Sequence, residues 1–407
     1  MFAEKKHMVI VCAYFHPMKH IAAFRMNAFV KYLDRDKFNI SVIASVDSSS
    51  YKESTFENAK VFYLSGSRIF KLRKQTTGMP RWKHILYSIN NKLIRLFFKS
   101  DYPGWAKKID SKLEELNAVK KIDILLTTFF PIDTHLAGLN FKKKNPSLIW
   151  VADMRDEMSH NALIDAKEKA YYAAIEKNIG QVVDVVTSVS QPIIDGFKIH
   201  MGQGRIHYLE VRNGFDHELK PSHNFNPEFT FTYAGTFYGK RKPDTFFNAL
   251  LELHVEGKLP AHWKVQFLGT HHNFSIPTEF KDNSVFLEAV SNEKAVELLA
   301  ISDCNLLIHP PSEAKGIFTG KLFDYLSVYK PILALVDKED VAAQLIEDCK
   351  AGFNCDFYSI QEIKTAILEV IELWSNQQFL DYQSNKIHQL HRRDQVKKLE
   401  NLLYDLM

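Results

Sequence analysis

The residues with the clearest chemical potential lie at the start of one expected helix, over 319–328. Thr319 and Gly320 lead into it, and Lys321 stands in its first turn. A helix N-terminus exposes N–H groups and a partial positive charge, and glycine lets the backbone approach an anion closely. Together with the charge of Lys321, these residues predict a phosphate site. The alternative that local sequence leaves open is a capped surface helix, with Thr319 as the N-cap and Lys321 in water.

Asp324 lies one helical turn beyond Lys321. A carboxylate at this place can accept hydrogen bonds from both hydroxyls of a ribose, as the acidic residue of dinucleotide sites does. Its alternative role is that of a favourable partner for the helix dipole. The surrounding sequence matches neither GxGxxG nor GxxxxGKS. The prediction of a nucleotide site therefore depends on residue chemistry and not on a common fingerprint.

A second loop, YAGTFYGKRKPD at 233–244, follows another expected strand. Gly235 and Thr236 stand at the end of that strand. Three consecutive cations follow: Lys240, Arg241 and Lys242. Arginine can bind a phosphate through two parallel hydrogen bonds, so these cations suit a diphosphate. Both loops are strand-to-helix turns in one half of the chain, and we expect them to converge on one anion. The alternative is a basic loop on a solvated surface.

The segment ADMRDEM, at 152–158, places dense charge at a strand end in the first half. Paired carboxylates there can do acid–base chemistry, and we assign that role to Asp156. Alternatively, Arg155 ties carboxylates together in a structural network. Histidines such as His135 are scattered near expected strand ends, and a lone histidine is more often structural than catalytic.

These loops need a scaffold to position them. Short apolar runs alternate with segments of helical period, a pattern typical of parallel sheets with helices on both faces. The expected strands are 8–15, 38–45, 122–128, 147–153, 182–189, 229–235, 263–269, 284–289, 304–309 and 331–336. We predict an α/β protein of two doubly wound domains, 1–216 and 217–378, with a C-terminal helix in 379–407 that packs back on the first domain. Ligands would bind at the carboxyl ends of the strands, in the cleft between the domains.

Composition narrows the class of protein. The 407 residues are 46% hydrophobic and 25% charged, which is typical of globular proteins. The four cysteines form no CxxC pair, and we expect a reduced, cytoplasmic protein without a signal peptide or a membrane span. The sequence has no HExxH motif and no acidic pair typical of a Mg²⁺ site, so we expect no metal and no cofactor.

Positive charge is concentrated in one segment of the sequence, called the basic block here. Residues 58–100 contain ten Lys or Arg and no Asp or Glu. From 68 to 100 the cations alternate with Phe, Leu, Ile and Trp, which suits an anionic membrane surface or a lipid-diphosphate acceptor. An ordinary amphipathic helix with a solvated basic face is the alternative. We expect no nucleic-acid partner, because no RNA-binding or helix-turn-helix pattern accompanies the block.

Several segments, in this order, resemble the retaining glycosyltransferases of family 4, which have the two-Rossmann-domain fold called GT-B. The resembling segments are VIVCAYFHP, AAFRMNAFVKYL, WVADMRDEM, VRNGFD, YAGTFYGKRKPDTFFNALLEL and TGKLFDYLSVYKPILALV, spread from about residue 8 to 355. The resemblance implies transfer of a sugar from a nucleotide-sugar, with retention and without a required metal. Each match is weak alone, and the order of the set makes it specific.

The resemblance also implies roles for single residues. Arg241 or Lys240 would hold the diphosphate with Lys321, and Asp324 would hold the ribose. The full donor set is Gly235, Thr236, Lys240, Arg241, Glu313, Thr319, Gly320, Lys321 and Asp324. The resemblance does not transfer the acceptor contacts. Our own assignment is Lys321, Arg241 and Asp156 for catalysis, and Arg25, His135, Asp153 and Arg155 for acceptor binding. Preorganised cations and a helix end would stabilise the leaving diphosphate in place of Mg²⁺.

The chain departs from the family pattern where the family has two glutamates separated by seven residues. The second falls on Asp324 and the first on Gly316, so Glu313 would have to replace the missing carboxylate. Lys19 and His20 replace a glycine pair of the family. The identity of the donor sugar is therefore open.

The leading hypothesis is a hexosyltransferase-type glycosyltransferase of surface polysaccharide or glycolipid synthesis. It would use a glycan or lipid-linked acceptor at the inner face of the membrane. One alternative is a GT-B-fold nucleotide-sugar epimerase, against which the basic block and the 319–328 helix argue. The other is a non-catalytic nucleotide-sugar binder, which the glycine at position 316 keeps open.

Overall fold

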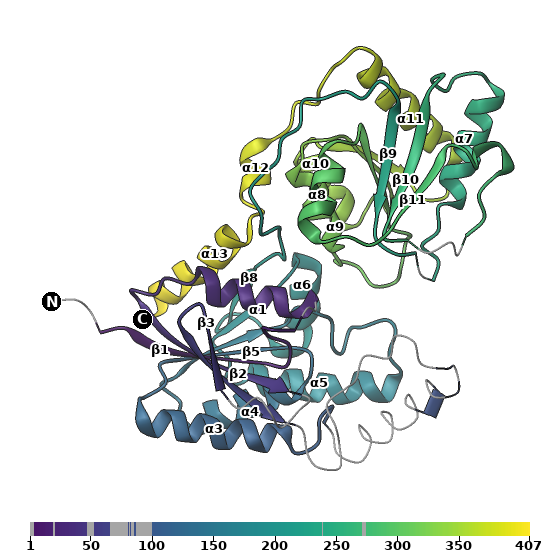
Figure 1. Cartoon of the computed structure of the whole chain (residues 1–407). Helices are drawn as coiled ribbons and strands as arrows, with labels where there is room; N and C mark the ends of the chain where they lie inside the picture. The colour runs from purple at the N-terminus through teal and green to yellow at the C-terminus, as the bar shows by residue number, and fades with distance from the viewer. Residues whose placement is uncertain are drawn as a thin grey trace. The chain divides into compact units, whose positions relative to one another are not determined.

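The computed structural model describes residues 4–18, 21–46, 53–65, 80, 82, 85–86, 100–237, 239–270 and 274–407. The chain forms two compact units (Figure 1): Met1–Arg212 with Val396–Met407, and Asn213–Gln395. The basic block at 68–100, expected to contact a membrane, lies almost entirely outside the described residues. No helix among the described residues is long and apolar enough to cross a membrane.

The first unit is built on a sheet of order β3-β4-β2-β1-β5-β6-β7-β8. Its strands are β1 (Lys6–Cys12), β2 (Phe38–Val46), β3 (Glu53–Phe56), β4 (Ala59–Ser65), β5 (Ile124–Thr128), β6 (Ile149–Asp153), β7 (Val185–Ser188) and β8 (His207–Glu210). Only β3 is antiparallel to its neighbour among these strands. Runs such as MVIVC are apolar at every position because helices cover both faces of a parallel sheet.

Alternation along β1 shows how the two faces are covered. Val9 and Val11 face one apolar cluster, while Met8, Ile10 and Cys12 face another. The first cluster is covered by α3 (Trp105–Val119), α4 (Asp133–Lys144), α5 (Ala166–Gly180) and α6 (Gln191–Met201). The second is covered by α1 (Ile21–Tyr32) and the C-terminal helix α13 (Arg392–Leu406). Each fully buried aliphatic side chain contributes about 1.5–3 kcal/mol to such a core.

The second unit has a six-stranded, wholly parallel sheet of order β11-β10-β9-β12-β13-β14. Its strands are β9 (Phe229–Ala234), β10 (Trp263–Leu268), β11 (Ser284–Leu287), β12 (Cys304–Ile308), β13 (Ile332–Val336) and β14 (Gly352–Asp356). Its helices are α7 (Asp244–Val255), α8 (Asn292–Ala300), α9 (Gly320–Ser327), α10 (Val341–Asp348), α11 (Ile360–Ser375) and the short α12 (Ser384–His388). A 3-10 turn, η1 (Thr278–Phe280), precedes β11.

Helices again cover both faces of this sheet. The aromatic-rich cluster under α7 and α11 fills one face, and the cluster under α8, α9 and α10 fills the other. The chain winds outward from β9 through β10 and β11, then starts again on the other side of β9 with β12. The strand order therefore reverses between β9 and β12. In open α/β sheets, ligands bind outside the carboxyl ends of the strands at such a point.

The two ends of the second unit lie side by side within it. Arg392 N donates to Phe215 O over 2.9 Å, and Arg392 Nε donates to Asn213 O over 2.9 Å. Gly214 has a φ of +65°, and a Cβ there would lie 2.1 Å from Leu390 O. The NGFD turn therefore needs glycine for two reasons, its backbone conformation and the close approach of the returning chain.

The prediction of two doubly wound sheets is confirmed. The sequence reading missed the β3–β4 hairpin and the edge strands β8 and β14. Of these strands, β3, β8 and β14 lie at the edges of the sheets, where one side has no neighbouring strand, so their sequences are only partly apolar and resemble loops. The largely apolar β4 pairs on both sides, with β3 and β2.

Candidate functional site

The candidate site lies at the reversal point of the second sheet, where β9 ends. Gly235 follows β9 with a φ of +105°, and its N donates to Leu268 O over 2.8 Å. A Cβ at this position would lie 3.2 Å from Lys321 Nζ. The backbone conformation thus favours glycine, and a Cβ here would crowd the end of the Lys321 side chain.

Helix α9 brings Lys321 to that place because Tyr325 fixes the helix on the sheet. The Tyr325 hydroxyl accepts a hydrogen bond from Ala234 N over 2.9 Å and donates to Leu306 O over 3.2 Å. Residues four apart in a helix share a face, so Lys321 is directed to the same carboxyl edge. The end of β9 and the middle of β12 are thereby joined to one helix.

Lys321 is buried at its charged end. Its Nζ has no hydrogen-bond partner among the described residues, and it lies 3.8 Å from the centroid of the Tyr233 ring. Burial, and then the charge of Arg241, lower the pKa of Lys321 well below its usual range. The alternative of a lysine in water on a surface helix is therefore wrong.

The N-terminus of α9 is open. Thr319 occupies the N-cap position, but its side chain makes no capping hydrogen bond, and no described residue bonds to its buried Oγ1. A Cβ added at Gly320 would meet no described atom within 4 Å. The backbone N–H groups of this first turn are therefore not capped by the Thr319 side chain.

Arg241 is the inward-facing member of the three predicted cations. It is 8% exposed, whereas Lys240 and Lys242 are exposed, as is Thr236. Its Nη2 donates to Nδ1 of His309 over 2.8 Å. His309 follows β12 directly, so this hydrogen bond also joins the ends of β9 and β12.

Asp324 lies on α9 beside the start of α8. Asn292 Nδ2 donates to its carboxylate over 3.3 Å, and His217 Nδ1 lies 3.9 Å from Oδ1. Burial raises the pKa of Asp324 to about 6, although Arg392 and Asn292 oppose the shift. Its side chain keeps 23% of its surface exposed.

Gly316 occupies the position of the missing glutamate. It has a φ of +88°, and its N donates over 2.8 Å to Oδ1 of Asp340, which also caps α10. The adjacent Lys315 pairs with Asp337. Glu313 is exposed on the same loop, and its contact with a donor sugar stays a prediction.

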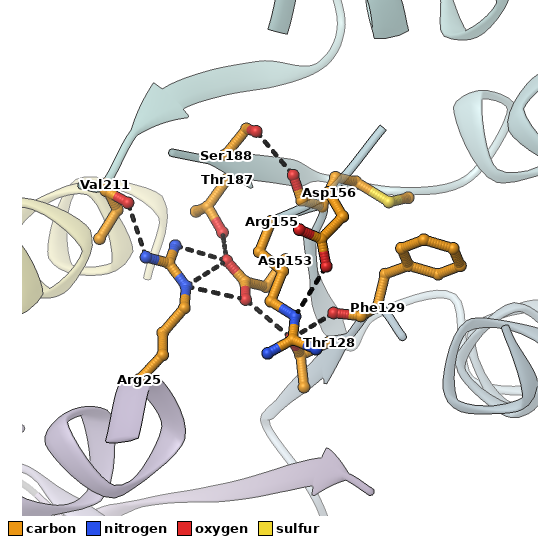
Figure 2. Close-up of polar contacts among 10 residues, drawn as sticks. Arg25, Thr128, Phe129, Asp153, Arg155, Asp156, Thr187, Ser188 and Val211 are labelled. Atoms are coloured by element: carbon orange, nitrogen blue, oxygen red, sulfur yellow. Dashed lines mark hydrogen bonds and ion pairs between the residues drawn. The ribbon is translucent and has the colours of Figure 1, made fainter. Parts of the chain in front are cut away.

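The charges of the first unit have a different environment. Asp153 ends β6 with no exposed surface, and Figure 2 shows Arg25 of α1 reaching its carboxylate. Arg25 Nη2 donates to Oδ1 over 2.7 Å, Thr187 Oγ1 donates over 2.7 Å and Thr128 Oγ1 over 2.9 Å. Burial alone would raise the pKa of Asp153, but Arg25 and the two hydroxyls hold it below its usual value. The second Arg25 nitrogen, Nη1, donates to Val211 O over 2.7 Å.

The other predicted residues of the first unit divide into a buried and a surface group. His135 has no exposed surface, and its Nδ1 lies 2.7 Å from Thr127 Oγ1. Burial lowers the pKa of His135 to about 3, so the imidazole is neutral. Arg155 and Asp156 form an ion pair of 3.3 Å in which the Asp156 side chain is 62% exposed (Figure 2). Acceptor contact by these residues stays a prediction.

Sequence reasoning missed five residues around the donor-side prediction: Tyr233, Tyr325, His309, Asn292 and His217. A signal existed for His309, because it is the last residue of an expected strand, 304–309, and ligands bind at the carboxyl ends of strands in such sheets. The two tyrosines were read only as apolar positions of a strand and a helix. No group of three or more His, Cys, Asp or Glu side chains in the described part of the chain is arranged to hold a metal ion.

Comparisons with known proteins show the fold. No family model matches the chain, and no curated protein matches it. Solved structures do. Sucrose-phosphate synthase from Thermosynechococcus elongatus has a TM-score of 0.68 and 11% identity, over 99% of both chains. The apo lipopolysaccharide outer core galactosyltransferase WaaB has a TM-score of 0.64 and 13% identity, over 99% of this chain and all of its own.

The similarity extends to another enzyme class. A putative UDP-N-acetylglucosamine 2-epimerase from Listeria monocytogenes has a TM-score of 0.54 and 10% identity, over 97% of this chain and 95% of its own. Identities this low carry the fold and not the reaction. This protein has the GT-B fold, which consists of two Rossmann-like units built on parallel sheets and which these solved structures share.

Proposed function

We propose that the protein is a glycosyltransferase that moves a sugar from a nucleotide-diphospho-sugar to a glycan or lipid-linked acceptor. The acceptor hydroxyl gives its proton to the Asp156 carboxylate and its oxygen bonds to the anomeric carbon of the sugar. The bond from that carbon to the nucleoside diphosphate breaks, and the nucleoside diphosphate leaves. The observation that carries the proposal is Lys321, whose buried Nζ has no described hydrogen-bond partner at the reversal point of the second sheet.

A buried amine without a partner is unfavourable, because it has lost its hydration without a compensating hydrogen bond. A diphosphate at this place would supply the partner and favour the charged form of Lys321. Arg241, 8% exposed on the neighbouring loop, would add a second cation, and the N–H groups of Thr319 and Gly320 a third contact. Preorganised groups of this kind stabilise a leaving diphosphate by about 3–4 kcal/mol each.

The remaining assignments follow from this donor site. Asp324 would accept hydrogen bonds from the ribose, and Gly235, Thr236, Lys240 and Glu313 would complete the donor contacts. Asp156 would act on the acceptor hydroxyl, with Arg25, His135, Asp153 and Arg155 lining or supporting the acceptor side. We further propose retention of anomeric configuration, chemistry that needs no metal or cofactor, and a cytoplasmic role in surface polysaccharide or glycolipid synthesis. Residues 68–100 would hold the enzyme at the membrane.

The experiment is a screen of nucleotide-sugars by thermal shift, followed by mass analysis of the products. Donor hydrolysis or transfer to an added acceptor supports the proposal. Conversion of the donor sugar alone would instead make the protein an epimerase, the class of one structural neighbour. Binding without turnover would make it a nucleotide-sugar binder.

The variant Lys321→Ala tests the donor site itself. We expect it to abolish binding of the nucleoside diphosphate that the wild type binds, measured by calorimetry. The control is Lys338→Ala, which removes an exposed lysine of the same unit that pairs with Glu362. Unchanged affinity in Lys321→Ala would refute the assignment.

A further inference from the structure

His309 is held rigidly by the sheet. It follows β12 at the reversal point, and its backbone N donates to Leu335 O of β13 over 2.9 Å. Two prolines follow it, which restrict the backbone beyond. The backbone from which the imidazole extends is therefore held at the carboxyl edge of the sheet.

Arg241 comes from a loop that carries two glycines in left-handed conformations. Gly235 and Gly239 flank the loop with φ values of +105° and +57°, and a Cβ at Gly239 would meet no described atom within 4 Å. Arg241 is nonetheless buried, with Nη2 donating to His309 Nδ1 over 2.8 Å. The hydrogen bond thus joins the loop that follows β9 to the residue that follows β12.

The accepting nitrogen belongs to a neutral ring. Burial, and then the charge of Arg241, lower the pKa of His309 to about 4, with Lys321 acting in the same direction. The two carboxylates that act against them, Asp340 and Asp337, already have partners. Asp340 accepts from Gly316 N and caps α10, while Asp337 pairs with Lys315. Nδ1 therefore accepts from Arg241 without bringing a negative charge.

A neutral acceptor has a particular use beside an anion site. A carboxylate would hold the guanidinium as firmly, but it would cancel the charge that a diphosphate needs. We propose that His309 is a positioning residue that orients Arg241 toward the diphosphate of the donor without itself adding a negative charge beside the guanidinium. This inference rests on the proposed function and adds a residue that neither sequence reasoning nor the donor assignments contain.

Three substitutions of His309 separate its effect on the orientation of Arg241 from the effect of a charge at the accepting group. His309→Asn places a neutral acceptor near the position of Nδ1, His309→Leu removes the acceptor, and His309→Asp replaces it with a charged one. The probes are uridine, guanosine, adenosine and thymidine diphosphates with the matching monophosphates, measured by calorimetry. The pair used is the one with the tightest wild-type binding.

We expect His309→Asn to bind the diphosphate within about threefold of wild type. His309→Leu should bind it about tenfold or more weakly, the effect of one lost hydrogen bond to a charged group. His309→Asp should be at least as weak as His309→Leu although it keeps an acceptor. The matching monophosphate should change less in every variant, which a general loss of structure would not produce. In the Arg241→Ala background, His309→Leu should have little further effect.

Equal diphosphate affinities for His309→Asn and His309→Asp would overturn the proposal. It would also be overturned if His309→Leu weakened diphosphate binding in the Arg241→Ala background as much as it does in the wild type. The nearly isosteric Asn and Asp variants keep the test decisive if His309→Leu does not fold. Failure of this inference can be told from failure of the proposed function. If only the role of His309 is wrong, the wild type still binds a diphosphate and Lys321→Ala does not. If the proposed function is wrong, the wild type binds none of the probes.

Discussion

Each unit buries a charged group near the carboxyl edge of its sheet, and the two groups are treated in opposite ways. In the first unit, the Asp153 carboxylate is surrounded by Arg25, Thr128 and Thr187. In the second, Lys321 Nζ is equally shielded from water but has no hydrogen-bond partner among the described residues. The comparison indicates that a buried charge with internal partners maintains the fold, while one without them is available to a ligand.

The comparison has a consequence for stability. Breaking a satisfied buried pair leaves the other charge uncompensated, whereas removing an unsatisfied buried group removes an unfavourable term. Substitutions in the two units should therefore change the free energy of unfolding with opposite signs.

The largest effect is expected in the first unit, from Arg25→Met. The change leaves the Asp153 carboxylate buried without its cation, and we expect the free energy of unfolding to fall by about 3–5 kcal/mol. Urea unfolding followed by tryptophan fluorescence measures it. As a control, Lys144→Met breaks an exposed pair with Glu114 and should cost less than about 1 kcal/mol. Similar losses from the two variants would contradict the structural role.

Glu176 of α5 is an intermediate case, because its buried carboxylate accepts hydrogen bonds from Ser159 N and Oγ, over 2.8 and 2.5 Å. Burial raises the pKa of Glu176 from 4.5 to about 7, although Ser159 opposes the shift. The folded state therefore binds the proton more tightly than the unfolded state. Its contribution is fully present below pH 4.5 and is lost as the pH rises through 7, by about 3 kcal/mol.

The variant Glu176→Gln tests this pH dependence. The amide oxygen can still accept from Ser159 N, but it has no proton to release. We expect the difference in unfolding free energy between wild type and variant to change by about 3 kcal/mol from pH 4.5 to pH 8. Parallel curves for the two proteins across that range would show that Glu176 does not titrate in it.

In the second unit, Lys321→Met keeps the alkyl stem and removes the amine. We expect the free energy of unfolding to rise by about 1–3 kcal/mol in the absence of ligand, because a buried unsatisfied group is lost. Diphosphate affinity should fall in the same variant. A loss of stability would mean that Lys321 supports the fold, and the contrast with Asp153 would fail.

The smallest effect is expected from Gly320→Ala at the start of α9. Alanine favours the helix, so thermal or urea unfolding should show a gain of roughly 0.5–1 kcal/mol. The added methyl meets no described atom of the protein but would occupy the space through which an anion approaches the backbone. Diphosphate affinity should therefore fall a few-fold. Unchanged affinity would place the ligand away from the helix N-terminus.

The sequence predicted features that depend on neighbours along the chain. The apolar runs indicated the parallel sheets, and the TGK stretch predicted a helix start with a cation, as found in α9. It could not show that Arg241 meets His309 or that Arg25 meets Asp153, because those partners are 68 and 128 residues apart. These contacts depend on strand order, which local sequence does not contain.

The side-chain direction of Asp153 illustrates the same limit. Being at a strand end predicts access to a ligand, but alternation places Asp153 on the same face as Val151, in the cluster under α1. The helix therefore covers the carboxylate and supplies Arg25. Beyond the strand, Asp156 is exposed, and Arg155 is half-buried.

The hydrogen bonds of Arg392 to Phe215 and Asn213 have a consequence for how such a protein can change. They bring the entrance and the exit of the second unit together, so the segment 213–395 is one contiguous piece of chain whose ends meet. A gene segment of this kind can be exchanged as a cassette without cutting either sheet. The specificity of one unit can thus diverge by recombination while the other unit is inherited intact.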